Sequence, residues 1–437
     1  MSALPPGWSR DRLKDVTEIN PSSLAAGTSR NYEFEYLEIS NVDYFGVIDA
    51  GAIERVTFEQ APSRARRIVQ KNCTVISSVR PNLQAAAHFP DDVSDFVCST
   101  GFNVVKPAEK LHSRFLHYSL LSEVARQYFE STATGVGYPA VADKDFNSLS
   151  LVFPSYADQQ RIATYLDASC AAIDAAVAAK RKQIETLDAL EMSLIHDTVT
   201  KGLRGMVPMS ETGLDWSPEA PRHWRVRQIK RMCSIVRGQF THRPRNDPAL
   251  YDGPYPFIQT GDITAAQKYI RTYGQTLNEL GLAASKQFPK GTLVMSIAAN
   301  IGDVAILDFE ACFPDSMVGL IPSHETDLHF LYYLMRAMRP IMLRSAVLST
   351  QLNLNYVRIG TNFAAFPPTA EQVKIAAYLD AKEREVQSIK SALQRQIDTL
   401  TAYRKSLIHE CVTGQRRISA EDLAGVGARL PEAEACA

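Results

Sequence analysis

The sequence is poor in cysteine, and its seven cysteines are scattered, with none arranged as C-x-x-C. An odd number of isolated cysteines argues against a disulfide framework and against a zinc site built from paired thiolates. The amino-terminal segment lacks the apolar core of a signal peptide, and no uninterrupted apolar run reaches the roughly 18 to 20 residues that span a bilayer. We therefore expect a soluble, cytoplasmic protein without disulfides, structural metal or membrane anchor.

An excess of charge of either sign is also missing. The chain has 47 basic and 48 acidic residues, which gives a formal net charge of −1. This balance excludes a uniformly basic coat for nucleic acid and an acidic tail protein, so a surface that binds anions must be local. With 437 residues, of which 45% are hydrophobic, the chain is long enough for two or three domains with their own cores.

Motifs of catalysis are absent as well. The sequence contains no G-x-x-x-x-G-K-[ST] loop, no G-x-G-x-x-G, no H-E-x-x-H and no G-x-S-x-G. Asn20-Pro21 and Asp247-Pro248 are not followed by the proline and aromatic residue of an adenine methyltransferase loop. No acid–base constellation stands out, and His196 and His409, at equivalent places near two expected helix ends, suit capping or packing better than catalysis. We expect a chain that is not an enzyme by itself.

What the sequence does contain is a duplication. Residues 153–200 align with residues 366–413 without a gap, with 22 identities in 48 positions. Both copies begin with FP followed by Q-x-x-I-A-x-Y-L-D, and both end with SLIH. A weaker echo links LEISNVD at 37–43 with QTGDIT at 259–264, so the regions that precede the two copies also look related.

The repeated segments read as long helices. Prolines stand at their starts, acids follow in the first turn, and more than 40 residues then pass without another proline. Apolar residues recur in a 4-3 rhythm that needs a partner helix, and the chain connectivity makes an antiparallel pair of the two copies the simplest solution. At about 1.5 Å per residue, each helix would be roughly 65 Å long. The expected core of the pair is Leu166, Ile173, Val177, Ile184, Leu187, Leu194, Leu379, Val386, Leu393, Ile397, Leu400 and Leu407.

The regions around the repeats alternate short β-type runs with turn residues and close with helical stretches, which is typical of α+β domains. The fold class that we expect is therefore α+β, with two α/β domains separated by two long antiparallel helices that form a coiled coil with pseudo-two-fold internal symmetry. The expected plan is a first domain at 1–152, a helix at 153–200, a linker at 201–221, a second domain at 222–365, a helix at 366–413, and a tail at 414–437 that returns toward the first domain.

This arrangement resembles the specificity subunit of a Type I restriction-modification system. The resemblance runs from Pro6-Gly7-Trp8 to about residue 414 and includes QTGDI at 259–263, KGTLVMSIAANIGDVAIL at 290–307, both Q-x-x-I-A-x-Y-L-D starts and both SLIH ends. It implies two target-recognition domains, each of which reads one half of a bipartite site in double-stranded DNA, with the helices as spacer ruler and docking site. It also implies two modification subunits that bind S-adenosylmethionine, and optional restriction subunits. LEISNVD and SSVRPN depart from the family phrases in the first half.

Loop-like stretches with arginine, lysine, asparagine and glutamine are the candidates for DNA contact. Arginine pairs with guanine, asparagine and glutamine pair with adenine, and each can hold a phosphate. A merely solvated surface is the alternative for each residue taken singly. The candidate DNA-binding residues are Arg64, Arg66, Arg67, Lys71, Arg80, Asn82, Gln84, Arg237, Gln239, His242, Arg243, Arg245, Lys286, Asn300 and Gln351.

Two further points stay open at the level of sequence. Outer helix faces would carry the contact with modification subunits, and Gln159, Arg161, Glu185, Lys374 and Arg395 are candidates that the pattern does not single out. A duplicated coiled-coil adaptor that binds only proteins is the alternative function, and salt-dependent binding to duplex DNA would distinguish the two.

Overall fold

The computed structural model describes residues 4–42, 46, 48–91, 95–203, 205, 207–345, 347–348, 352–354 and 356–427. These residues form two compact units. Unit 1 is Met1–Arg181 with Gln394–Ala437, and unit 2 is Lys182–Leu393. Each unit therefore combines one of the two expected α/β domains with the beginning of one long helix and the end of the other, because the boundaries fall within both helices.

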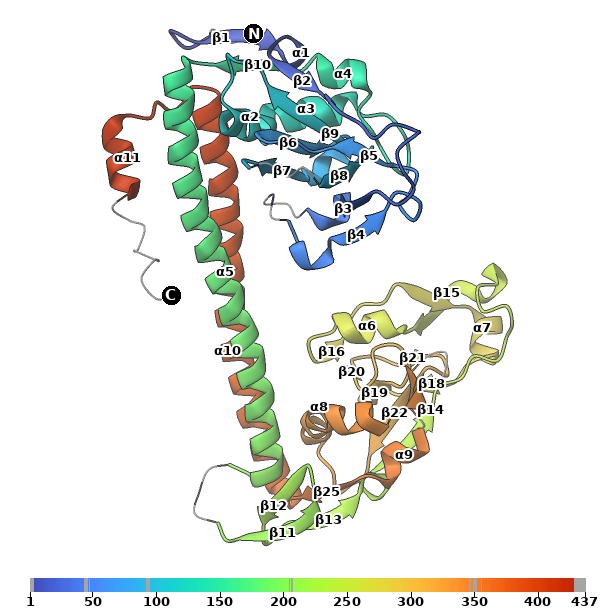
Figure 1. Cartoon of the computed structure of the whole chain (residues 1–437). Coiled ribbons are helices and arrows are strands. Elements are labelled where there is room, and N and C mark those ends of the chain that lie inside the picture. Colours follow the sequence, from blue (N-terminus) through green and yellow to red (C-terminus); the bar gives the residue numbers. More distant parts are fainter. Residues whose placement is uncertain are drawn as a thin grey trace. The chain divides into compact units, whose positions relative to one another are not determined.

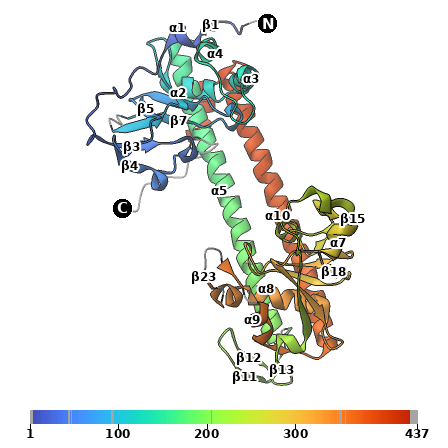
Figure 2. The ribbon, with the colours of Figure 1, turned by 90° about the vertical axis from the view of Figure 1, so that its right-hand side faces the viewer.

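Unit 1 contains two four-stranded sheets with the orders β2-β9-β6-β7 and β4-β3-β8-β5, and a separate pair β1-β10. Helix α2 covers the sheet that contains β6, β7 and β9 (Figure 2). The strands are β1 Ser9–Arg12, β2 Thr17–Ile19, β3 Glu33–Leu37, β4 Glu54–Thr57, β5 Ala65–Ile68, β6 Cys73–Ser77, β7 Ala86–Phe89, β8 Phe96–Ser99, β9 Phe102–Pro107 and β10 Ser150–Phe153. The helices are α1 Leu13–Val16, α2 Ser113–Leu120, α3 Glu123–Thr132, α4 Asp143–Asn147 and α11 Ala420–Gly427.

Unit 2 contains the sheets β14-β22-β19-β20-β16 and β17-β15-β21-β18, the pair β13-β25, and two hairpins, β11-β12 and β23-β24. The first strands are β11 Met209–Leu214, β12 Ser217–Pro221, β13 Arg225–Gln228, β14 Cys233–Arg237, β15 Tyr251–Phe257, β16 Tyr269–Ile270, β17 Gln275–Leu277 and β18 Gln287–Phe288. The others are β19 Leu293–Ser296, β20 Val304–Leu307, β21 Ala311–Cys312, β22 Met317–Pro322, β23 Val347–Leu348, β24 Leu352–Asn353 and β25 Phe363–Phe366. The helices are α6 Thr260–Ala265, α7 Glu279–Ala283, α8 Leu328–Ser345 and α9 Tyr356–Thr361.

The two units have the same topology. The order β2-β9-β6-β7 of unit 1 returns as β14-β22-β19-β20, and β4-β3-β8-β5 returns as β17-β15-β21-β18. The parallel pairs β3 with β8 in unit 1 and β15 with β21 in unit 2 stand at corresponding places. Unit 2 has a further parallel pair, β16 with β20. Even the weak echo in sequence has a structural basis, because Glu38 with Asn41 and Gln259 with Asp262 form the same reciprocal capping box. The duplication therefore extends over the whole unit.

The repeated segments form α5, Tyr156–Lys201, and α10, Thr369–Val412 (Figure 1). Within unit 1, Asp174 pairs with Arg404 at 3.0 Å and Lys180 donates to Gln396 at 2.5 Å, so numbers rise along α5 as they fall along α10. The expected antiparallel helix pair and the α+β fold class are thereby confirmed. Six of the twelve residues of the expected helix-pair core are buried, and the other six are half-buried. The buried ones are Leu166, Ile173, Val177, Leu379, Ile397 and Leu407.

A glutamine that both repeats share fixes the start of each long helix to its domain. Gln159 is 0% exposed, accepts from the backbone N–H of His112 at 2.8 Å, and donates to the carbonyls of Lys110 and Pro154. Gln372 repeats this pattern in unit 2. A buried amide with all these bonds is fixed in orientation. Gln159 therefore does not lie on an outer helix face, contrary to the suggestion that it contacts a partner.

The aspartate of each repeat makes a second tie. In unit 1 the hydroxyl of Tyr118 on α2 donates to Asp167 at 2.7 Å, and in unit 2 Tyr333 on α8 donates to Asp380 at 2.5 Å. Burial raises the pKa of both tyrosines, and the carboxylates that accept from them act in the same direction. Both hydroxyls therefore stay protonated donors. Glutamine and aspartate together explain why Q-x-x-I-A-x-Y-L-D recurs.

Unit 2 adds a charged network that unit 1 does not repeat. Arg336 on α8 bonds Glu191 of α5 at 2.9 Å and Glu383 of α10 at 2.6 Å, and the three side chains are 20%, 7% and 16% exposed. The equivalent positions in unit 1 are Leu121, Arg404 and Cys170, and Arg404 pairs with Asp174 instead. A buried pair that loses one partner leaves a costly unpaired charge, so this triad fixes how α8 sits on the helices of its own unit.

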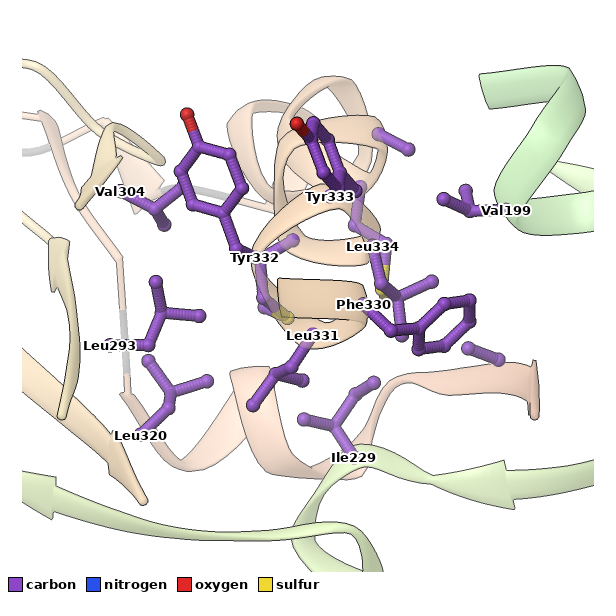
Figure 3. Close-up of a cluster of buried hydrophobic side chains, with 14 of the residues drawn as sticks. Val199, Ile229, Leu293, Val304, Leu320, Phe330, Leu331, Tyr332, Tyr333 and Leu334 are labelled. Atoms are coloured by element: carbon purple, nitrogen blue, oxygen red, sulfur yellow. The ribbon is translucent and has the colours of Figure 1, made fainter. Parts of the chain in front are cut away.

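The main core of unit 2 surrounds α8. Phe330, Leu331, Tyr332, Tyr333 and Leu334 are all nearly or fully buried, and they meet side chains from several sheets and from the end of α5 (Figure 3). Figure 3 shows Leu293, Val304 and Leu320 on one side of this helix and Ile229 and Val199 on others.

Part of the expected linker is ordered. Residues 209–221, assigned to a linker from their glycine, proline and serine content, form the hairpin β11-β12, which continues into unit 2. The start of α5 lies at Tyr156, because residues up to Phe153 belong to β10. Beyond α10, Arg416 donates to the hydroxyl of Tyr165 at 2.8 Å, so the described part of the tail packs in unit 1.

One helix, α5, has an 18-residue window of mean hydropathy 1.3 that could span a membrane by length and composition, and 39% of this window is buried. A core helix of a soluble protein meets the same criterion, and α5 lies against α10 through the contacts described above.

We expect the half-buried His88 and the buried His117 to make the stability of unit 1 sensitive to acid. Burial, reinforced by the nearby Arg114, lowers the pKa of His88 to about 4, and burial also lowers the pKa of His117 well below its usual value. Unfolded histidine titrates near pH 6.5, so below that pH the unfolded state binds protons that the folded state refuses, and stability falls as pH drops from about 6.5 toward 4. Thermal denaturation at pH 7 and pH 5 should show this loss. The double variant His88→Ile, His117→Tyr carries the residues that stand at these positions in unit 2, Ile306 and Tyr332. It should lose less stability between pH 7 and pH 5. An equal loss would show that these two histidines do not cause the acid sensitivity.

Candidate nucleic-acid interface

The candidate residues of unit 2 gather on the loop between β14 and β15. The base of this loop is aromatic, because Phe240 is 3% exposed and its ring lies 5.0 Å from that of Phe257. Tyr251 adds a third ring to the cluster. Above this base the loop is exposed at Arg243, Arg245 and Asn246. Because the aromatic residues at its base are packed, the loop can hold its exposed polar side chains in a fixed orientation.

The guanidinium groups of this loop are positioned by neighbours. Arg245 bonds Asp315 at 2.5 Å and is 47% exposed, and Arg237 donates to the backbone carbonyl of the same Asp315 at 2.8 Å. Arg243 donates to the carbonyls of Phe240 and His242 at 2.7 and 2.8 Å. His242 itself contacts Asp247 at 3.1 Å. Each arginine keeps donors to spare, since a guanidinium has five N–H groups.

Three other candidates of unit 2 lie on its exposed surface. Gln239 and Lys286 are exposed, and the hydroxyl of Ser285 donates to the carbonyl of Gln239 at 2.9 Å, which brings their two loops together. Asn300 is exposed at the turn between β19 and β20, and its amide donates to Thr264 at 2.9 Å. Gln351 lies outside the described residues.

The four basic candidates of the segment 64–71 in unit 1 separate into different environments. Arg64 is 59% exposed and bonds Glu38 at 2.7 Å, and this hydrogen bond raises its pKa. Arg66 lies over the ring of Phe58 at 4.8 Å. Lys71 is exposed. Arg67 points inward, where it donates to the carbonyl of Phe102 and to Asn103, and burial lowers its pKa.

Arg67 therefore braces the sheets of unit 1, whereas Arg64, Arg66 and Lys71 remain on the candidate surface. The sequence SRARRIVQK does not show which arginine is internal and which is on the surface, because this depends on the side of β5 to which each side chain points.

The turn between β6 and β7 carries the other candidates of unit 1. Asn82 is exposed, but the amide of Gln84 donates inward to the carbonyl of Leu121 at 3.1 Å. Arg80 has a left-handed backbone with φ of 50°, and its guanidinium lies 4.4 Å from the ring of Tyr138. At the equivalent turn of unit 2, Ala299 also has a positive φ, 59°. Strained residues at the same turn in both copies suggest that the shape of this turn matters for function.

Sequence reasoning missed Tyr138. This side chain is 72% exposed on a loop whose Pro139 carbonyl accepts from the backbone of Arg80 at 2.7 Å, so the two loops form one surface. The glycines of TGVGYP at 134–139 were the available signal, since a glycine-rich loop that ends in an aromatic residue can present that residue to a ligand.

The combined arrangement offers exposed guanidinium, amide and phenol groups on loops, which is the chemistry that binds phosphates and base edges. Among the described residues no group of three or more histidine, cysteine or acidic side chains is arranged to hold a metal ion.

Comparisons with known proteins show the family to which this chain belongs. The family model described as "Type I restriction modification DNA specificity domain" matches twice, at residues 5–186 and 221–399. The specificity subunit of the Type I restriction enzyme MjaIX of Methanocaldococcus jannaschii is 20% identical over 95% of this chain and 95% of its own length. That of HindI of Haemophilus influenzae is 21% identical over 71% of this chain and 75% of its own.

Two solved structures share the fold. One is a chain from work on complex assembly and conformational transition of the type I R-M system, with a TM-score of 0.74 and 22% identity over 95% of this chain and 100% of that chain. The other is the HsdS subunit of Thermoanaerobacter tengcongensis, with a TM-score of 0.50 and 22% identity over 95% of this chain and 99% of that chain. Since the two matches of the family model cover most of the sequence, the chain belongs to the DNA specificity family of Type I restriction-modification systems, as a specificity subunit and not a catalytic one.

Proposed function

We propose that this chain reads a bipartite site in double-stranded DNA, with unit 1 reading one half and unit 2 the other. The observation that carries the proposal is the repetition of one topology in two units, each with polar side chains exposed on corresponding loops. Two related but non-identical readers on one chain suit two half-sites of different sequence.

The loop chemistry supports DNA as the ligand. Arg243 and Arg245 in unit 2, and Arg80 and Asn82 in unit 1, can donate to guanine, adenine or phosphate. The net charge of −1 means that affinity must come from these local groups. Such binding weakens as salt rises, because each phosphate contact releases counterions.

The long helices would set the gap between the half-sites. Each continues through the boundary between the two units, at Arg181 in α5 and at Leu393 in α10. Helical backbone bonds satisfied within the segment resist bending more than a loop does. The helix pair would therefore act as a ruler for the spacing of the target sequence.

Two modification subunits would dock on this body, and optional restriction subunits would join them. The duplicated helices give two equivalent sets of outer faces, on which Glu185, Lys374 and Arg395 are exposed and Arg161 is half-buried. S-adenosylmethionine would be held by the modification subunits, and this chain would hold no cofactor. A protein-only adaptor remains the second candidate function, and the absence of any duplex preference at low salt would favour it.

Exchange of one reader tests the assignment of half-sites. Replacing residues 1–152 with the corresponding region of another specificity subunit should change one half of the methylated sequence and leave the other half and the gap unchanged. Methylome sequencing of cells that contain the chimera and its modification subunit gives the result. The reciprocal exchange of residues 222–365 is the control, and a chimera that alters both halves would contradict independent reading.

The ruler is tested at the unit boundary. Seven residues inserted after Arg181 and seven after Leu393 preserve the 4-3 rhythm and lengthen the pair by roughly 10 Å, or about three base pairs. Methylome sequencing should show an enlarged gap with both half-sites retained. An insertion in α5 alone should abolish methylation, because the apolar residues of α5 would no longer face those of α10. Altered half-sites with the original gap would refute the ruler.

Two candidates of unit 1, Arg67 and Asn82, should behave differently. Arg67→Met should lower the free energy of unfolding by about 1 to 3 kcal/mol, because the groups that accept from Arg67 lose their donor. Asn82→Ala should leave stability unchanged and weaken binding to the cognate duplex by roughly tenfold. Calorimetry and titration at fixed salt measure both quantities. Equal effects of the two variants on binding, after correction for folding, would contradict the division.

A further inference from the structure

Two neighbouring loops of unit 1 expose large apolar side chains. One is the turn between β6 and β7, residues 78–85, and the other is the segment 134–140 that follows α3. In the second loop Val136 is fully exposed and Tyr138 is 72% exposed, and in the first Leu83 is 48% exposed. A group of apolar side chains on a soluble surface marks a site of contact with another molecule, so the two loops are a candidate binding surface.

Backbone hydrogen bonds close the second loop and fasten it to the first. Thr134 and Ala140 donate to each other's carbonyls, both at 2.9 Å. The backbone N–H of Arg80 donates to the carbonyl of Pro139 at 2.7 Å. Since Tyr138 adjoins this contact in the chain, its side chain projects from a fixed base and loses little conformational freedom on binding.

The corresponding loop of unit 2 is closed by the same pairing. The bridge between Thr134 and Ala140 recurs, 213 residues later, as the first residue pair of the hairpin β23-β24. This spacing is that of the whole repeat, and it places Gln351 at the sequence position of Tyr138. A ring and an amide contact bases in different ways, so this position distinguishes the two units as readers.

One face of the Tyr138 ring is already occupied. The guanidinium of Arg80 lies over this face, 4.4 Å from the ring centroid, in a cation–π contact. Because the tyrosine side chain is 72% exposed in spite of this contact, its opposite face is open to a second flat partner. A ring with one free face can stack on the end of a base stack, whereas full intercalation between two base pairs requires both faces.

The charges around the ring favour a nucleic acid over a protein as the partner. Residues 78–85 and 134–140 contain Arg80 and no acidic residue, and Asn82 on the first loop is exposed. A guanidinium keeps donors for a phosphate while it lies on a ring, because it has five N–H groups. Aromatic rings beside such groups bind bases by stacking, which every base permits.

We propose that Tyr138 stacks with its free face on a base at an opened step of the duplex, while Arg80 holds an adjacent phosphate. This role rests on the proposed function, since the opened step lies within the half-site that unit 1 reads. Opening costs least at flexible pyrimidine–purine steps. Tyr138 therefore contributes to sequence preference without a hydrogen bond to a base edge.

Affinity for a duplex tests the role of the ring. The full chain with its modification subunits is titrated, at fixed salt, with a duplex that carries the sequence identified by methylome sequencing. Tyr138→Ala should weaken binding by roughly tenfold, because the stacked base loses its partner, and Tyr138→Phe should bind like the unaltered chain. Tyr32→Ala, which removes an exposed tyrosine outside both loops, is the matched control and should also bind normally. Thermal denaturation should be the same for all variants, since the altered side chains lie at the surface.

Nicked duplexes test the opened step. A nick leaves every base in place but lowers the cost of unstacking, so a nick at the step that Tyr138 opens should tighten binding by roughly threefold. The gain should occur for the unaltered chain and for Tyr138→Phe, only in the half-site that residues 1–152 determine. A nick that tightens binding of Tyr138→Ala to the same extent would contradict the opened step. Nicks in the other half-site are the control, because they should act alike on all three proteins.

The remaining outcomes separate stacking from the proposed function. Undiminished binding by Tyr138→Ala, with normal binding of the unaltered chain, would overturn stacking and leave DNA reading intact. Equal weakening by Tyr138→Phe would overturn stacking too, because the hydroxyl and not the ring would then make the contact. Loss of a modification subunit from Tyr138→Ala, measured by light scattering, would assign the loop to a protein partner instead. An unaltered complex without preference for the duplex would refute the proposed function itself.

Discussion

The structure depends on how each long helix is fixed to the domain that precedes it. A buried glutamine, Gln159 or Gln372, satisfies backbone groups of the domain and of the helix start at once, so neither partner can rotate without leaving polar groups unpaired. A tyrosine hydroxyl on the domain helix then reaches the aspartate two turns further along. Two directional ties on one helix face define an orientation, which apolar packing alone would leave adjustable.

The two units share these helix–domain contacts but differ at other positions. In unit 2, Arg336 links α8 to both long helices through Glu191 and Glu383. In unit 1, Leu121 stands in place of Arg336 and Cys170 in place of Glu383. Unit 1 carries histidines where unit 2 has a tyrosine and an isoleucine. The glutamine and aspartate that fix each long helix to its domain are the same in both units, whereas these other positions differ.

The candidate DNA-binding surface is organised differently. Its arginines are exposed but steered by acids and carbonyls of their own domain, as Asp315 steers Arg237 and Arg245. Steering lowers the entropy lost when a flexible side chain is fixed on a ligand. If this surface binds DNA as proposed, the pairing would also limit indiscriminate binding of polyanions by a nearly neutral chain, because part of the positive charge is balanced until a matching duplex competes for it.

The sequence by itself determined the duplication, the two long helices, their antiparallel pairing and the family, because these leave periodic or repeated marks that survive without tertiary information. It did not determine that 209–221 is a hairpin, since glycine and proline mark turns and linkers alike. Only the tertiary structure decided that Gln159, Arg67 and Gln84 point inward while Asn82 and Tyr138 face solvent. The physical reason is that a polar residue takes its role from the groups around it, and neighbours distant in sequence supply those groups only after folding.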